Sequence, residues 1–372
     1  EIQPMAATRG ATEAAALLLG VPVLEPRITI CGRSRAALGL HEDAARSAAQ
    51  AVYSARFSKS GELIALSMGD GVVEVHNVKT GVLVAKHQGE GFQPCTCLRW
   101  APRQQKNIII TANCEGFIEE WDVDLNRRVD QVREPNNNAI YALDNTDNGH
   151  YLASAGKDKI IRIYDVANID SGPINLLEVS GESTHLISVE AHSNRIYSLK
   201  FPHADDNLLL SGGWDNTVQI WDLRTKKAVR HLSGCHIAGD SVDVYDKTIL
   251  TGSWTKGKSL ALWDLGTGNK IKDIDWSPGF TGLSRLYTAQ FSKMDRGSHC
   301  IAGGSDNKEA RIFNVESGQV VGRIPTGKGP TGHEAIVYCS HFSLTAPEVA
   351  VSTSDGRVLI VPYLTPTRAR AA

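Results

Sequence analysis

Short runs in which apolar and polar residues alternate recur along the chain. The clearest of them read VYSARF (52–57), CTCLRW (95–100), IYSLKF (196–201), LYTAQF (286–291) and VYCSHF (337–342). Alternation with a period of two turns every second side chain to the same face, so each run predicts a strand with a buried face. Turn-forming clusters separate the runs, for example SKSGE, DNGH and TSDG. The pattern therefore predicts many short antiparallel strands.

A longer period is superimposed on this alternation. The segment 192–224, HSNRIYSLKFPHADDNLLLSGGWDNTVQIWDLR, has weaker copies on both sides, and most copies end in an aromatic residue followed by Asp or Asn. The anchor residues of the copies are His76, Trp121, Tyr164, Trp221, Trp263, Phe313 and, where the pair is lost, Val361. Successive anchors lie 42 to 57 residues apart. A repeat of this length predicts the blades of a propeller.

The segment 192–224 resembles a WD repeat in its histidine, serine, aspartate and tryptophan, which are His192, Ser211, Asp215 and Trp221. The resemblance implies an all-β fold, a seven-bladed β-propeller with four antiparallel strands per blade. Little chain follows the seventh copy, and an open ring would expose a sheet edge. In such proteins an N-terminal strand commonly completes the last blade, and VPVLEPRITIC at 21–31 is the expected closing strand.

These expectations divide the chain into one domain and two tails. The propeller is expected at 21–364, with an N-terminal tail at 1–20 and a C-terminal tail at 365–372. Its blades are expected at about 51–90, 93–134, 137–180, 192–234, 235–275, 284–325 and 333–364, the last joined by strand 21–31. The stretch 33–50 is expected to be a short helix or a linker, and the insertion 166–191 is longer than a hairpin loop requires.

The four polar residues of the best copy form a structural tetrad in the family that it resembles. Polar groups buried between strands need partners, and a linked set supplies one to each. Other copies retain part of the set: His236, Thr251 and Trp263 in the fifth, Ser154 and Asp158 in the third, Asp70 in the first and Asp355 in the last. Asn136 stands where the histidine is expected in the third copy, and Glu115 where the aspartate is expected in the second.

Composition narrows the function classes. A net charge of −2 and a pI near 6.7 give no overall basic surface for DNA or RNA, so direct contact with nucleic acid is not expected. Seven scattered cysteines do not form a disulfide framework, which favours a reducing, cytoplasmic location; cytoskeletal, ciliary or nuclear association is left open. No apolar run is long enough for a membrane span, so no membrane partner is expected. The chain begins with Glu, and whether residues are missing upstream is left open.

Two motifs resemble chemical sites. The segment 252–259, GSWTKGKS, matches the phosphate-loop pattern, but that pattern must lead into a helix, and here a strand ending in Trp263 and Asp264 follows. We interpret it as a lengthened hairpin. His231, Cys235 and His236 are possible zinc ligands without a fourth at suitable spacing. No nucleophile elbow or isolated carboxylate pair is present, so we expect no enzyme activity, metal, cofactor or small-molecule substrate.

One register position stands out across the copies. Five residues after the tetrad histidine, five of the seven copies carry tyrosine, in a chain that has nine. The set is Tyr53, Thr96, Tyr141, Tyr197, Ser241, Tyr287 and Tyr338. In WD-repeat proteins this position faces the mouth of the central channel. Arg195 and Arg285 stand two residues earlier, and Trp214 and Trp254 stand nearby, all residue types that dominate protein interfaces. The competing interpretation is that these tyrosines pack against the next blade with their hydroxyls bonded to a loop.

The sequence therefore predicts a non-enzymatic scaffold, one subunit of a larger assembly that binds other proteins on the tyrosine-lined face. A second hypothesis is a substrate receptor of a cullin-type ubiquitin ligase, because Trp221, Asp222 and Arg224 resemble its W-D-x-R box. A third, from another class, is a nucleotide-binding propeller that uses the 252–259 loop. The identity of the partner cannot be read from the residues.

Overall fold

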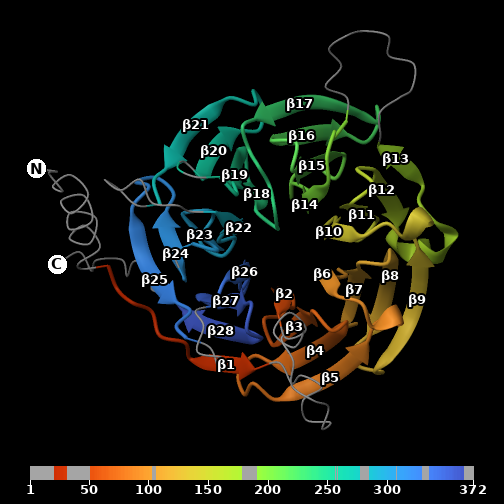
Figure 1. Ribbon diagram of the computed structural model, residues 1–372, viewed down its shortest axis with the longest axis horizontal. Coiled ribbons are helices and arrows are strands. Elements are labelled where there is room, and N and C mark those ends of the chain that lie inside the picture. The colour runs from red at the N-terminus through yellow and green to blue at the C-terminus, as the bar shows by residue number, and fades with distance from the viewer. Residues whose placement is uncertain are drawn as a thin grey trace, which may run out of the picture.

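Seven four-stranded sheets surround a central channel in the computed structural model (Figure 1). The structure describes residues 21–31, 51–102, 106–177, 191–255, 257, 259–276, 285–306, 308–328 and 335–363. Within this part, neighbouring strands of every blade pair antiparallel. The predicted all-β, seven-bladed propeller is confirmed. No helix in these ranges is long and apolar enough to span a lipid bilayer.

Each blade runs from an inner strand at the channel to an outer strand at the rim. The inner strands are β2 (Val52–Phe57), β6 (Cys95–Trp100), β10 (Ile140–Asn145), β14 (Ile196–Lys200), β18 (Val242–Tyr245), β22 (Leu286–Phe291) and β26 (Val337–Phe342). The second strands are β3 (Leu63–Met68), β7 (Ile108–Asn113), β11 (Tyr151–Gly156), β15 (Leu208–Gly213), β19 (Thr248–Gly252), β23 (His299–Gly304) and β27 (Glu348–Thr353).

The remaining strands complete the blades in the same order. The third strands are β4 (Val72–Asn77), β8 (Phe117–Asp122), β12 (Ile161–Asp165), β16 (Thr217–Asp222), β20 (Leu260–Asp264), β24 (Glu309–Asn314) and β28 (Arg357–Pro362). The outer strands are β5 (Leu83–Gln88), β9 (Arg127–Arg133), β13 (Asn175–Leu177), β17 (Lys227–Ser233), β21 (Lys270–Ile274), β25 (Val320–Pro325) and β1 (Ile28–Cys31). The described ranges also contain the 3₁₀ turns η2 (Glu90–Phe92), η3 (Pro135–Asn137) and η4 (Val166–Ser171).

The N-terminal strand closes the ring. β1 pairs antiparallel with β28, and Ile30 lies opposite Val358, so the first strand in the chain is the outer strand of the seventh blade (Figure 1). Arg27 reinforces the junction through an ion pair with Glu348, with its Nε 2.8 Å from Oε1. Upstream, the backbone nitrogen of Leu24 donates to Arg323 of the sixth blade at 2.8 Å. The segment therefore joins two blades as well as completing one.

The core lies between the blades rather than in one central layer. Each buried cluster combines neighbouring blades; one joins Ile64 and Leu66 of the first blade to Val358 and Ile360 of the seventh. The buried faces follow the alternation in the sequence, because strand pleating sends alternate side chains into the two flanking interfaces. Every blade thus depends on both neighbours, which makes closure of the ring a condition for its stability.

Several sequence predictions fall on residues that the structure does not describe. The tails at 1–20 and 365–372 and the possible helix at 33–50 lie outside the described residues. The insertion at 166–191 is described up to residue 177, where η4 and the short outer strand β13 follow the third strand, and again from residue 191.

Candidate functional site

The polar tetrad of the fourth blade is a continuous chain of hydrogen bonds. His192 Nδ1 lies 2.7 Å from Asp215, His192 Nε2 lies 2.6 Å from the Ser211 hydroxyl, and Trp221 Nε1 donates to the same hydroxyl at 2.8 Å. His192, Ser211 and Trp221 are buried. The chain links the loop before β14 to strands β15 and β16. It therefore holds the residues that lead into Tyr197.

In the fifth blade the structure corrects the predicted register by one residue. His236 does not bond Thr251; its Nδ1 lies 2.7 Å from Asn216 Oδ1, at the surface. The buried thiol of Cys235 takes the histidine's place, 3.8 Å from Thr251 Oγ1, and Trp263 Nε1 donates to that hydroxyl at 2.9 Å. Burial raises the pKa of Cys235 to about 11, so it remains an uncharged thiol.

The same shift moves the channel-facing position of this blade from Ser241 to Asp240. Val242 pairs with Thr251, as Leu199 of the fourth blade pairs with Ser211. Asp240 lies two residues before Val242, and Tyr197 lies two residues before Leu199. Asp240 of the fifth blade is therefore the equivalent of Tyr197 in the fourth. Gly239 precedes it, and a Cβ on Gly239 would meet the carbonyl oxygen of Tyr287 at 2.3 Å. A glycine is thus required for this close approach.

The third blade has a different polar centre from the one predicted. Asn136 lies in η3 with φ of 59° and does not take the histidine's place. The buried side chain of Glu134 does: it accepts hydrogen bonds from Ser154, from Asn138 at 2.6 Å, from Arg162 at 3.0 Å and from the Tyr164 hydroxyl at 3.2 Å. Burial raises the pKa of Glu134, and Arg162 opposes that rise.

Eight aromatic rings form an almost complete circle around the mouth of the channel, which we call the aromatic belt. In order they are Tyr53, Tyr338, Tyr287, Trp254, His236, Trp214, Tyr197 and Tyr141. Successive ring centroids lie between 4.7 and 6.3 Å apart, and Tyr141 and Tyr197 are parallel to within 7°. The structure thus brings together all five tyrosines and both tryptophans of the predicted face, and it adds His236.

The belt has one gap and two flanking cations. The gap is at the second blade, where Thr96 replaces tyrosine and its hydroxyl donates to Ile140 O at 2.6 Å. The guanidinium of Arg195 lies 5.6 Å from the ring centre of Trp214, and that of Arg285 lies 4.8 Å from the ring centre of Trp254. These distances are within the range of cation–π attraction. Both predicted arginines therefore belong to the same surface.

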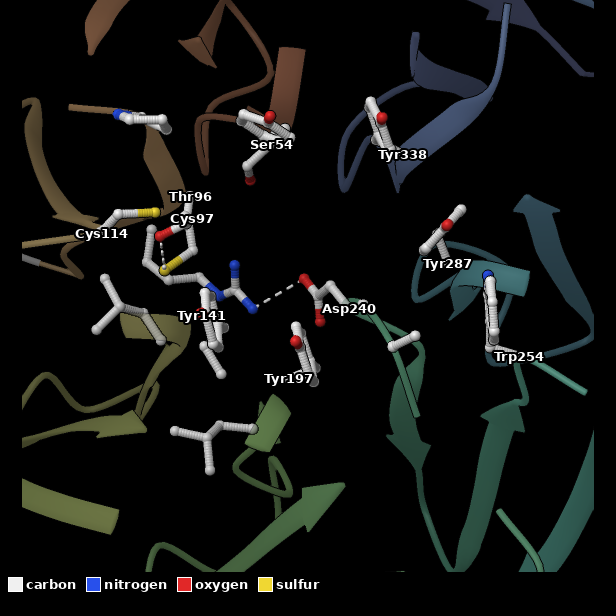
Figure 2. Close-up of a pocket in the computed structure, with 18 of the residues that line it drawn as sticks. Ser54, Thr96, Cys97, Cys114, Tyr141, Tyr197, Asp240, Trp254, Tyr287 and Tyr338 are labelled. Carbon is white, nitrogen blue, oxygen red and sulfur yellow. Dashed lines mark hydrogen bonds and ion pairs between the residues drawn. The ribbon is translucent and has the colours of Figure 1, made fainter. Parts of the chain in front are cut away.

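The belt encloses a cavity of about 380 Å³ at the mouth of the channel (Figure 2). Its lining includes the five tyrosines, Trp214, Trp254, Thr96, Cys114, Arg99 and Asp240, and Figure 2 shows Asp240 near Tyr197. Below, Asp240 forms ion pairs with Arg56 of the first blade and with Arg99 of the second, the latter at 3.0 Å. This bridge crosses the channel and separates the upper cavity from a smaller one of about 130 Å³ beneath it.

The belt tyrosines are half-buried, and their hydroxyls are largely unused by the protein. Among the described residues, the charge of Arg195 acts on the Tyr197 hydroxyl, and the other four hydroxyls have no hydrogen-bond partner. Burial raises the pKa of Tyr338 to about 12, so its hydroxyl keeps its proton at neutral pH. In the same part of the chain, the buried indole nitrogen of Trp254 also lacks a partner. The wall therefore offers hydrogen-bonding groups to a ligand.

The ligase-adaptor motif is split between core and surface. Trp221, 1% exposed, is committed to the tetrad. Arg224 is 73% exposed in its side chain and forms an ion pair with Asp222 at 2.8 Å. Of the three residues, Arg224 alone has a mostly exposed side chain.

The motifs that resemble chemical sites belong to structural elements of the propeller. The 252–259 segment lies between β19 and β20, with Gly252 opposite Leu260; Lys256 and Lys258 lie outside the described residues. His231 lies on outer strand β17, whereas Cys235 contacts Thr251 in the core and His236 lies in the aromatic belt. No group of three or more potential ligands among the described histidines, cysteines, aspartates and glutamates is placed to hold a metal ion.

Comparison with known proteins gives a consistent picture. Residues 129–165 and 183–222 match the family model described as WD domain, G-beta repeat. The chain is similar to the anaphase-promoting complex subunit cdh1 of Dictyostelium discoideum, with 24% identity over 69% of this chain and 30% of that protein. It is also similar to the WD repeat-containing protein srw1 of Schizosaccharomyces pombe, with 27% identity over 63% of this chain and 38% of that protein.

A third relative is the serine-threonine kinase receptor-associated protein of Gallus gallus, with 24% identity over 58% of this chain and 53% of that protein. The chain spans between about a quarter and about half of the length of the first curated relatives that it matches. The repeat match, these relatives and the ring of seven four-stranded sheets agree. The chain is therefore a member of the WD-repeat β-propeller family.

Proposed function

We propose that this protein is a non-enzymatic interaction module that binds a segment of another protein on the aromatic belt. The observation that carries the proposal is the near-continuous circle of eight rings around a cavity of about 380 Å³. Ligand pockets usually measure about 300–1,000 Å³ and combine apolar walls with a few polar groups. Tyrosine, tryptophan and arginine are also the residues that contribute most to binding energy at protein interfaces.

The hydrogen bonding of the polar groups in the aromatic belt supports a role in binding a partner rather than in packing the core alone. If the tyrosines served the core alone, their hydroxyls should bond to neighbouring loops, because buried polar groups are normally satisfied. In the described part of the chain, the buried Trp254 indole nitrogen has no such bond, and four of the five belt tyrosines, which line the cavity, have no hydroxyl bond to another residue. A bound peptide, whose backbone carries both donors and acceptors, would satisfy them.

Two further observations support a role in a larger intracellular assembly. The relative from Dictyostelium discoideum is named as a subunit of a complex, and the relative from Gallus gallus is named for its association with a receptor. All seven cysteines are free thiols, which is typical of proteins from reducing compartments. We therefore propose that the module acts as one subunit among several.

The test is a double substitution, Tyr197→Ala with Tyr287→Ala, in a tagged protein used for affinity capture and mass spectrometry. Because interface hot spots each contribute about 2 kcal/mol or more, we expect belt-dependent partners to be captured at least about tenfold less. The matched control is Tyr151→Ala with Tyr245→Ala, two half-buried tyrosines at the other end of their strands. We expect the two double variants to lose similar amounts of melting temperature.

Two outcomes would contradict the proposal. One is unchanged capture by the belt variant. The other is a fall in melting temperature much larger than that of the control, which would identify the belt as core. Recovery of a cullin adaptor that depends on Arg224, and not on the belt, would favour the ligase-receptor hypothesis instead.

A further inference from the structure

The floor of the belt cavity differs chemically from its wall. At the channel-facing position of the inner strand, five blades carry tyrosine and the second carries threonine, but the fifth carries Asp240. Asp240 is the carboxylate among the residues that line the cavity. Its side chain is 22% exposed, so it remains accessible from the cavity.

The two carboxylate oxygens of Asp240 are used unequally. Arg56 Nη2 and Arg99 Nη2 both contact Oδ2, the latter at 3.0 Å. The other oxygen, Oδ1, has only the Ser198 hydroxyl, at 3.5 Å, among its described hydrogen-bond partners. A contact at this distance is at the limit of a hydrogen bond. The floor of the cavity therefore holds a carboxylate oxygen with capacity to accept further hydrogen bonds, and Figure 2 shows Asp240 beside Tyr197.

Arg99, the arginine that lines the cavity, does not offer a matching donor. Arg99 uses all three nitrogens: Nε for Asp144 at 2.9 Å, Nη1 for the Leu98 carbonyl at 3.0 Å, and Nη2 for Asp240. Arg56 is buried and lines the lower cavity instead: its two terminal nitrogens contact Ser340 O and Asp240, and its buried Nε has no hydrogen-bond partner among the described residues. Two guanidinium groups face the carboxylates of Asp240 and Asp144, and Lys200 Nζ lies 3.5 Å from Asp144 below the upper cavity. A ligand that brings a donor fits this floor better than one that brings an acceptor.

The wall adds a preference for positive charge. The face of an aromatic ring carries negative potential and attracts cations, most strongly for tryptophan. Within this protein, Arg195 and Arg285 already lie over Trp214 and Trp254 on the belt. We propose that the belt cavity takes a cationic side chain, lysine or arginine, from the bound partner segment, and that Asp240 selects it. This inference rests on the proposed function, because it names the chemistry that the belt recognises.

The test uses short blocked peptides that differ at one central residue between glycines and serines. The central residue is lysine, arginine, norleucine or glutamate, and each peptide is titrated into the full chain while tryptophan fluorescence and heat are recorded. We expect the lysine or the arginine peptide to bind at least about tenfold more tightly than the norleucine peptide, the size of a desolvated cation–π contact, and the glutamate peptide to bind most weakly.

Variants of the floor connect that preference to Asp240. Asp240→Asn keeps the shape and removes the charge, so the advantage of the cationic peptide over norleucine should shrink to about twofold or less, and Asp240→Glu should restore part of it. The matched control is Asp144→Asn, which also removes a carboxylate from Arg99 but lies below the upper cavity. The Asp144→Asn variant should keep the preference for the cationic peptides over the norleucine peptide. Should Asp240→Asn fail to fold, the wild-type and Asp240→Glu comparisons across the four peptides still decide.

The outcomes separate this inference from the proposed function. Equal binding of norleucine and cationic peptides, no binding of any cationic peptide, or a preference that survives in Asp240→Asn would overturn the inference. Partner capture that depends on Tyr197 and Tyr287 would stand in each of those cases. Capture that ignores the two tyrosines would overturn the proposed function itself.

Discussion

Replacing Glu134 by alanine should lower the free energy of unfolding by about 3–5 kcal/mol, the usual cost of removing one partner from a buried ion pair. Four donors converge on this carboxylate, from Ser154, Asn138, Arg162 and Tyr164. The change leaves all four without their acceptor inside the third blade, and Arg162 keeps only Asp158 as a charged partner. Chemical denaturation followed by circular dichroism measures the loss.

The matched control is Asn136→Gly, two residues away at the position where the sequence pattern placed the centre of the network. Asn136 has φ of 59°, a backbone conformation that glycine adopts without strain, so the change should cost less than about 0.5 kcal/mol. Glu134→Gln should fall between the two, because its amide oxygen still accepts but its nitrogen faces the donors of Arg162 and Asn138. A larger loss from Asn136→Gly than from Glu134→Ala would show that the network is wrongly assigned.

The sequence predicted the fold well because its signals are local and repeated. Alternating runs identified five of the seven inner strands, and the anchor residues identified seven blades. The expectation of closure followed from a physical requirement, since a propeller that lacks an outer strand exposes an edge. The structure supplies that strand at Ile28–Cys31.

The polar networks were harder to predict because different residues can satisfy the same buried hydroxyl. In the fifth blade both Cys235 and His236 stand near the expected position, and histidine was preferred by analogy with His192. The structure uses the thiol, which packs as a small apolar group, and frees the imidazole for the belt. Burial lowers the pKa of His236, which favours an uncharged ring between two indoles.

The choice of His236 over Cys235 as the tetrad residue also affected the prediction of the channel-facing residue in the fifth blade. Five tyrosines were found by counting from the tetrad histidine, but the same count from His236 gave Ser241 instead of Asp240. The signal was present, because Asp240 stands five residues after Cys235. Its partners were beyond any local pattern: Arg56 and Arg99 are 184 and 141 residues away in the chain and meet Asp240 only across the closed ring.

The second prediction concerns ring closure, because the first strand of the chain, β1, is the outer strand of the seventh blade. Ile30→Asp should lower the free energy of unfolding by about 4 kcal/mol or more, because it places a charge where a buried side chain packs between the first and seventh blades. Ile30 is 4% exposed and lies opposite Val358 on β28. Weakening β1 also uncovers the edge of β28, so the variant should form oligomers visible by light scattering.

The neighbouring residue provides the control for this prediction. Thr29 lies on the same strand, but alternation turns its side chain to solvent. Thr29→Asp introduces the same charge without burying it, so it should change the free energy of unfolding by less than about 1 kcal/mol and leave the protein monodisperse. Equal losses from the two variants would mean that β1 is attached by its backbone alone. A loss confined to Ile30→Asp, together with new oligomers, would show that burial of the Ile30 side chain on the closing strand is needed to keep the ring closed.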